Sequence, residues 1–182
     1  MVTLPNLISI ARLLFVPVVI WAILDGRFAT AFWIFILSGI SDGIDGYIAR
    51  RFDMKSELGA YLDPIADKAL LVAVFLSLNV VGLLPLWLVI AVTARDLLIV
   101  GAVNLAWMVG RPMEIRPLMV SKATTAIQII TAATFLGKAA FDLRVAELEN
   151  ALILGTAALT LLSAAAYLLA WLRHMAADQP PS

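Results

Sequence analysis

The sequence contains no cysteine and a single histidine among its 182 residues. A disulfide, a zinc–thiolate site and a thiol nucleophile are therefore excluded. Charged residues are also scarce, at 14% against 63% hydrophobic residues, whereas a soluble domain is nearer a quarter charged and under half apolar. The formal net charge is zero, which argues against a nucleic-acid-binding protein. Together these shortages predict an integral membrane protein.

The hydrophobic residues form six long runs, each close to the about 20 residues that cross a bilayer as a helix. We therefore predict an all-α protein with six transmembrane helices. The expected helices cover roughly residues 7–24, 28–50, 59–81, 84–107, 118–136 and 151–172. We expect one membrane domain over residues 1–173 and a polar C-terminal tail over 174–182. The N-terminus has neither a basic segment nor a cleavage site, so we predict no signal peptide.

The distribution of basic residues predicts how the chain is oriented. Six spans place both termini on the same side of the membrane. The basic residues expected on that side are Arg50, Arg51, Lys55, Arg111, Arg116 and Arg173. Those expected on the opposite side are Arg27, Lys138 and Arg144. Because basic loops stay in the cytoplasm, both termini and the acidic segment described next are predicted at the cytoplasmic face of the inner (cytoplasmic) membrane.

Four aspartates lie close together in an otherwise apolar part of the chain. Asp42 and Asp45 are three residues apart, and Asp63 and Asp67 are four apart, so each pair would share one face of a helix. A polar turn over residues 51–57 would fold the two helices antiparallel and bring the pairs together. Clustered carboxylates repel one another unless they are protonated or bound to cations. Oxygen ligands in this number suit magnesium or manganese, and two divalent ions would balance the four charges.

Other ionisable residues also fall within the predicted spans, where such residues usually line a cavity. Arg95 and Asp96 could belong to a substrate site, or could pair with buried charges and hold helices together. Lys122 could bind substrate, or extend to the membrane interface. Arg12 could contact a ligand, or anchor its helix at the interface. The sequence leaves both readings open for each residue.

The acidic segment resembles the signature of the CDP-alcohol phosphotransferase (CDP-alcohol phosphatidyltransferase) family, D-x2-D-G-x2-A-R-x8-G-x3-D-x3-D. Every fixed position is filled, by Asp42, Asp45, Gly46, Ala49, Arg50, Gly59, Asp63 and Asp67. The chain length and the six expected helices are also similar to those of the family. Its members transfer a phosphatidyl or similar group from a CDP-linked lipid to an alcohol and release CMP. The resemblance therefore implies an enzyme of phospholipid biosynthesis.

The resemblance also implies roles for individual residues. Two magnesium or manganese ions would be held by Asp42, Asp45, Asp63 and Asp67, and Asp67 would also be the catalytic base. The CDP-diacylglycerol donor would be contacted by Asn6, Gly46, Arg50, Ser56 and Gly59. The candidates for binding the acceptor are Arg95, Arg111, Arg116 and Lys122. The family further implies a homodimer in the lipid bilayer.

The resemblance leaves two glycerol-type acceptors open. The stretches PNLISIARLLFVPV and SDGIDGYIARRF resemble members that use glycerol-type acceptors, the cardiolipin synthases and phosphatidylglycerophosphate synthases. The stretch that begins Ala94-Arg95-Asp96 departs from the second group, so phosphatidylglycerol is the expected acceptor and glycerol 3-phosphate the alternative. Two other classes are weaker readings. A membrane prenyltransferase would separate its aspartate motifs further, and an ion-coupled transporter would hold its acids nearer the membrane midplane.

Overall fold

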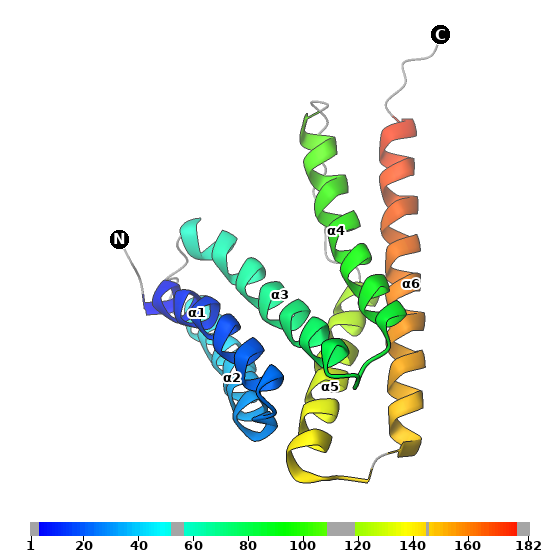
Figure 1. Cartoon of the computed structure of the whole chain (residues 1–182). Coiled ribbons are helices and arrows are strands. Elements are labelled where there is room, and N and C mark those ends of the chain that lie inside the picture. The colour runs from blue at the N-terminus through cyan, green and yellow to red at the C-terminus, as the bar shows by residue number, and fades with distance from the viewer. Residues whose placement is uncertain (1–3, 52–56, 109–118, 145, 178–182) are drawn as a thin grey trace. The chain divides into compact units, whose positions relative to one another are not determined.

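The structure is a computed structural model that describes residues 4–51, 57–108, 119–144 and 146–177. Within these ranges, side chains are described except at 4–10, 42–51, 57–65, 67, 103, 104, 106, 107 and 174–177. All six elements in this part of the chain are helices, and none of its residues forms a strand. The helices are α1 (Leu4–Leu24), α2 (Phe28–Arg51), α3 (Glu57–Val80), α4 (Leu86–Met108), α5 (Met119–Phe141) and α6 (Ala146–Ala177) (Figure 1). The all-α prediction is confirmed.

The last two helices are longer than the sequence predicted. Helix α5 continues through Lys138 to Phe141, and α6 begins at Ala146 and ends at Ala177. The charged residues in these added turns stabilise the helix ends, because a cation is favourable near a helix C-terminus and an acid near an N-terminus. Lys138 lies in the last turn of α5, and Glu147 lies in the first turn of α6.

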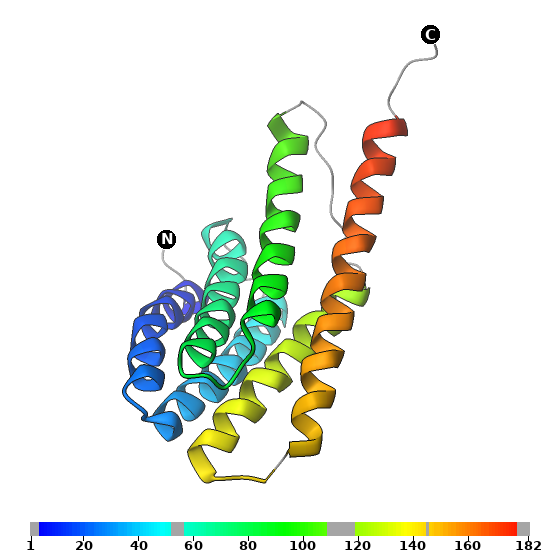
Figure 2. The same cartoon turned by 45° about the vertical axis from the view of Figure 1, so that its right-hand side comes forward.

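The chain forms two compact units. The first unit comprises residues 1–85 and 132–146, and therefore contains α1, α2, α3 and the end of α5. In this unit α1 packs against both α2 and α3 (Figures 1 and 2). The fully buried side chains that fill its core include Val19, Ile23, Val74, Phe75, Leu78, Phe135 and Leu136. Because α1 touches both neighbours, it fixes the two helices that carry the acidic segment.

Glycine ends two of the helices of the first unit. Gly26 and Gly82 have φ angles of 75° and 77°, in the left-handed region that favours glycine. After α1, the Gly26 N–H donates to the Ile23 carbonyl (3.1 Å) and the Arg27 N–H to the Ala22 carbonyl (2.8 Å). This pair of bonds is the Schellman motif, which satisfies the last carbonyls of a helix. It lets α2 turn back along α1 after only a short connection.

The second unit comprises residues 86–131 and 147–182, with α4, the first part of α5, and α6. Hydroxyl groups link α5 to α6. The Thr124 hydroxyl donates to the Leu159 carbonyl at 3.0 Å, and the hydroxyls of Thr131 and Thr156 lie 2.8 Å apart. Buried hydroxyl pairs of this kind hold helices together in apolar surroundings. The interface is also close, because a Cβ added at Gly155 would come within 2.9 Å of the Ile127 side chain.

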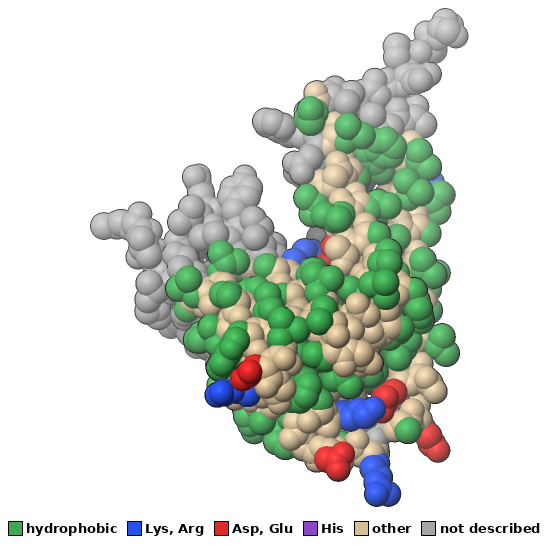
Figure 3. All heavy atoms as spheres, viewed as in Figure 1, with side chains coloured by type: hydrophobic (Ala, Val, Ile, Leu, Met, Phe, Trp, Pro, Cys, Tyr) green, Lys and Arg blue, Asp and Glu red, His purple; other side chains and the backbone are tan. Residues whose placement is uncertain are grey.

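Apolar side chains cover much of the described surface (Figure 3). Two helical segments in the described part of the chain are long and apolar enough to cross a membrane, Met119–Phe141 and Ala146–Arg173. Shorter apolar helical stretches occupy Ala11–Leu24, Phe28–Ser41 and Lys68–Val80. Two of the six predicted transmembrane helices are thus long and apolar enough in the structure to span a membrane. The other four spans stay a prediction.

Candidate functional site

The acidic segment spans two consecutive helices of the first unit. Asp42 and Asp45 belong to the C-terminal half of α2, and Asp63 and Asp67 to the N-terminal half of α3. The predicted arrangement of one aspartate pair on each of two helices joined by a short connection is therefore present in the backbone. The four carboxylates themselves lie outside the described side chains. Among the side chains that are described, no group of three or more acids or histidines is placed to hold a metal.

The predicted contacts to the donor lipid lie in the same region. Gly46 and Arg50 belong to α2, Gly59 to α3 and Asn6 to the first turn of α1. The side chains of Asn6 and Arg50 are outside the described set, and Ser56 is outside the described residues altogether. What the structure adds is that α1, which carries Asn6, packs on both α2 and α3.

Buried and half-buried polar residues lie on α1 and on the part of α2 that leads to Asp42. Arg12 of α1 is buried, with only 3% of its surface exposed, although it sits in an apolar helix. Ser38 of α2 is buried as well, and Ser41, directly before Asp42 in the sequence, is half-buried. Arg12, Ser38 and Ser41 line one pocket together. The interfacial anchor that the sequence allowed for Arg12 would be exposed, so its burial argues against that reading.

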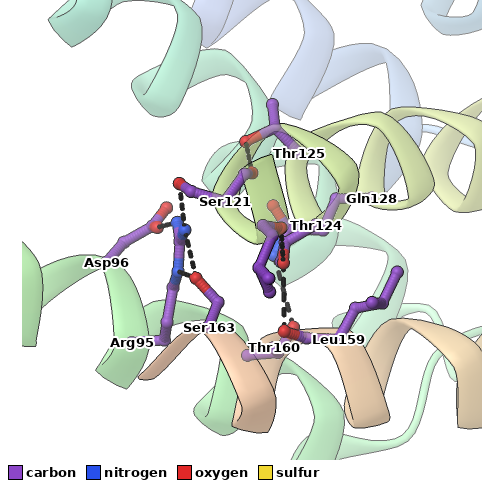
Figure 4. Close-up of polar contacts among 10 residues, drawn as sticks. Arg95, Asp96, Ser121, Thr124, Thr125, Gln128, Leu159, Thr160 and Ser163 are labelled. Atoms are coloured by element: carbon purple, nitrogen blue, oxygen red, sulfur yellow. Dashed lines mark hydrogen bonds and ion pairs between the residues drawn. The ribbon is translucent and has the colours of Figure 1, made fainter. Parts of the chain in front are cut away.

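In the second unit, Arg95 is the centre of a buried polar cluster (Figure 4). Its Nη1 donates to Asp96 Oδ1, its Nη2 donates to Ser121 Oγ at 2.6 Å, and both Nε and Nη2 donate to Ser163 Oγ at 3.1 and 2.7 Å. The guanidinium also lies 5.9 Å from the ring centroid of Tyr167. These partners come from α4, α5 and α6, so Arg95 joins all three helices of the unit.

Arg95 and Asp96 bring opposite charges into the buried cluster. Arg95 is 2% exposed and Asp96 7%, and burying a charge is costly unless it is paired and hydrogen-bonded. Asp96 supplies the balancing charge, and the two serines accept further N–H groups. The planar N–H donors of the guanidinium match the oxygens of a phosphate. The cluster can therefore stabilise the helix packing and also present a partly neutralised cation to an anionic group.

The other three acceptor candidates lie elsewhere. Lys122 follows Ser121 on α5, and its side chain is exposed, which agrees with the reading that it extends to the membrane interface. The reason is helical register. Ser121, Thr124 and Gln128 are spaced by three and four residues and face the interior, so position 122 turns outward. Arg111 and Arg116 lie outside the described residues.

The partners of Arg95 on α6 were not singled out from the sequence. Ser163 and Tyr167 are neutral, so they lack the charge that marks a functional candidate within an apolar run. A signal was nevertheless present. Thr156, Thr160, Ser163 and Tyr167 recur every three or four residues in α6, and this spacing puts them on one helical face. All four are buried.

Comparison with known proteins agrees with the signature. The model of the CDP-alcohol phosphatidyltransferase family matches residues 2–173. The chain is 33% identical over 159 residues to cardiolipin synthase (CMP-forming) of Rattus norvegicus, covering 77% of this chain and 52% of that protein. It is 37% identical over 150 residues to the chloroplastic CDP-diacylglycerol--glycerol-3-phosphate 3-phosphatidyltransferase 1 of Oryza sativa, covering 73% and 46%. The chain thus spans about half the length of these curated relatives. It belongs to the CDP-alcohol phosphatidyltransferase family.

Proposed function

We propose that this protein is a membrane enzyme of phospholipid biosynthesis that transfers a phosphatidyl group from CDP-diacylglycerol to phosphatidylglycerol, releasing CMP and forming cardiolipin. One observation carries the proposal: the complete family signature, laid out on the two consecutive helices α2 and α3. Family membership accounts for the four aspartates, so neither a prenyltransferase nor an ion-coupled transporter is needed to explain them. The apolar helices and the relatives' names support a membrane location.

The chemistry of the donor set fits a two-metal site. Enzymes of this family generally depend on divalent metal ions. Asp42, Asp45, Asp63 and Asp67 offer carboxylate oxygens only, which suit magnesium or manganese. When bound, two such ions neutralise charge on the donor diphosphate and on the departing CMP.

The protein's own groups would handle the proton and the donor. Asp67 takes the proton from the acceptor hydroxyl, whose oxygen then bonds to the phosphatidyl phosphorus while the bond to the CMP oxygen breaks. Arg50 binds donor phosphate, because the planar N–H donors of a guanidinium match phosphate oxygens. The products are CMP and a phosphodiester lipid.

The charge near the acceptor candidates supports phosphatidylglycerol over glycerol 3-phosphate. A soluble phosphomonoester dianion is best held by several converging basic residues. Arg95 shares its charge with Asp96, and Lys122 is exposed. A phosphatidylglycerol headgroup carries one negative charge and needs fewer cations. The rice relative, whose name gives glycerol 3-phosphate as its substrate, keeps that acceptor as the second candidate.

An acceptor panel tests this assignment. Purified protein is given CDP-diacylglycerol and magnesium or manganese, with phosphatidylglycerol or glycerol 3-phosphate added separately. We expect CMP release with phosphatidylglycerol and little release with glycerol 3-phosphate. The reverse pattern would reassign the acceptor and leave the family and the aspartate roles intact.

We further propose six membrane spans, with both termini and the aspartates at the cytoplasmic face of the inner membrane, and a homodimer. Labelling of single cysteines tests the orientation cleanly, because the chain has none of its own. Ser56→Cys should be protected in intact cells from a membrane-impermeant thiol reagent, whereas Glu147→Cys in the exposed first turn of α6 should react. Labelling of the first and protection of the second would invert the orientation.

A further inference from the structure

A small pocket opens between α1 and α2, beside the acidic segment. It has a volume of about 150 Å³ and is lined by Ala11, Arg12, Phe15, Ile34, Leu37, Ser38 and Ser41. All seven residues belong to the first unit. None of them is part of the family signature, and no role discussed so far uses the pocket.

The pocket is polar at one end and apolar at the other. α1 and α2 are joined by the short turn at Gly26 and run back along each other. Arg12 and Ser41 are further from that turn in sequence than Phe15 and Ile34. The polar end therefore lies toward the aspartates, and α2 passes directly from Ser41 into Asp42. The apolar end lies deeper along the helices.

Burial gives the polar end its chemical preference. Arg12 is 3% exposed, so its charge acts in surroundings of low dielectric constant, where it attracts an anion or a carbonyl oxygen strongly. A guanidinium has five N–H donors and can engage several acceptors at once. Ser38 and Ser41 add hydroxyl donors on the facing helix. A ligand that fits must combine polar oxygens with an apolar chain.

The surroundings of the pocket favour a lipid. Large apolar side chains of the pocket lining and of its sequence neighbours are exposed, including Leu37 of the lining at 58% and its neighbours Leu14 and Ile40 at 67% and 53%. A surface of this kind on a membrane protein faces acyl chains. The pocket is too small for a whole lipid and large enough for one ester group with the first methylene groups of its chain.

We propose that this pocket holds a glycerol ester and the start of one acyl chain of CDP-diacylglycerol, with Arg12 and Ser38 donating hydrogen bonds to its oxygens. The inference rests on the proposed function, because that function places the donor's diphosphate at the aspartates that follow Ser41. The order of groups along the donor, diphosphate then ester then chain, matches the order along α2, from the acids through the serines to Ile34. Arg12 is thus a specificity-determining residue for the lipid donor.

Steady-state kinetics with matched variants tests the site. Arg12→Gln removes the charge but keeps hydrogen-bond donors, Arg12→Lys keeps the charge, and Ser38→Leu fills the polar end. We expect KM for CDP-diacylglycerol to rise about tenfold in Arg12→Gln, with a smaller rise in Arg12→Lys, as expected for a lost charged hydrogen bond. kcat should change far less. Leu24→Trp, at an exposed position at the other end of α1 and outside the pocket lining, is the control and should leave both constants unchanged.

A cross-linking readout needs no turnover. CDP-diacylglycerol with a photoreactive group near the ester should label peptides of α1 or α2, and both Ser38→Leu and Arg12→Gln should weaken this labelling. Unlabelled CDP-diacylglycerol should compete, and phosphatidylglycerol should compete poorly. Equal competition by phosphatidylglycerol, or label found only outside these helices, overturns the assignment.

The two proposals fail in different ways. If wild-type protein releases CMP but the KM of Arg12→Gln equals that of wild type, the pocket assignment is wrong and the function stands. If wild-type protein releases no CMP from CDP-diacylglycerol, the function is wrong, and cross-linking alone then decides whether the pocket takes this lipid. If Arg12→Gln unfolds in detergent, Arg12→Lys is measured in its place. Because Arg12→Lys keeps the positive charge, we expect its KM for CDP-diacylglycerol to rise, but by less than tenfold.

Discussion

Replacing Asp67 by Asn is expected to lower turnover by about 10³-fold or more, because it removes the proposed base, and such groups contribute about 10²- to 10⁴-fold. The same change removes one of the charges that would hold the metal ions. Asp42→Asn, Asp45→Asn and Asp63→Asn should also abolish most turnover by weakening metal binding. The neutral amide has nearly the shape of the carboxylate, so all four variants should stay folded in detergent.

A metal-binding readout separates this account from simple loss of activity. Manganese or magnesium should stabilise the wild-type protein against thermal unfolding, since a ligand that binds only the folded state raises its stability. The Asn variants should lose this stabilisation. Asp25→Asn is the matched control, because Asp25 lies in the exposed turn after α1 and pairs with Arg27 at 2.7 Å. Metal stabilisation that persists in all four variants would contradict the proposed metal site.

Replacing Arg95 by Met is expected to destabilise the second unit by about 3 kcal/mol or more. The substitution deletes the guanidinium that pairs with buried Asp96 and that joins Ser121 of α5 to Ser163 of α6. Removing one partner of a buried ion pair costs about 3 to 5 kcal/mol, because the other charge stays in the interior. Thermal or denaturant unfolding in detergent measures the loss.

The double variant Arg95→Met/Asp96→Leu is the control for this prediction. Replacing both members of a buried pair by apolar residues is often nearly neutral, so the double variant should recover much of the stability. If Arg95 also contacts the acceptor, activity should stay low despite that recovery. Full activity in a stable double variant would restrict Arg95 to a structural role.

The helices were predictable because their apolar runs are long and their breaks are marked. Gly26 and Gly82 adopt the left-handed backbone that ends a helix, and both are visible as glycines between apolar runs. The ends of α5 and α6 were placed short because charged residues were read as loop. In the structure, Lys138 and Glu147 lie within the helices, where the helix dipole stabilises each at its own end.

The candidate site was predictable to different degrees in its two parts. The aspartate spacing depends only on local helical geometry, so the sequence was sufficient to assign the pairs to two consecutive helices. The partners of Arg95 depend on how α4, α5 and α6 pack. Ser163 lies far along the chain and carries no charge, so nothing local links it to Arg95. Helical register likewise decided that Ser121 faces inward and Lys122 outward.

Release of CMP from CDP-diacylglycerol by the purified protein tests the central claim most directly. Both acceptors are supplied together, so that the result does not depend on the choice between them, and the reaction is run with and without a chelator. We expect CMP and a new phosphodiester lipid in equal amounts, loss of both with chelator, and recovery on adding magnesium or manganese. Stable, folded protein that forms neither product in the presence of these metals would contradict the assignment of phosphatidyl transfer to this chain.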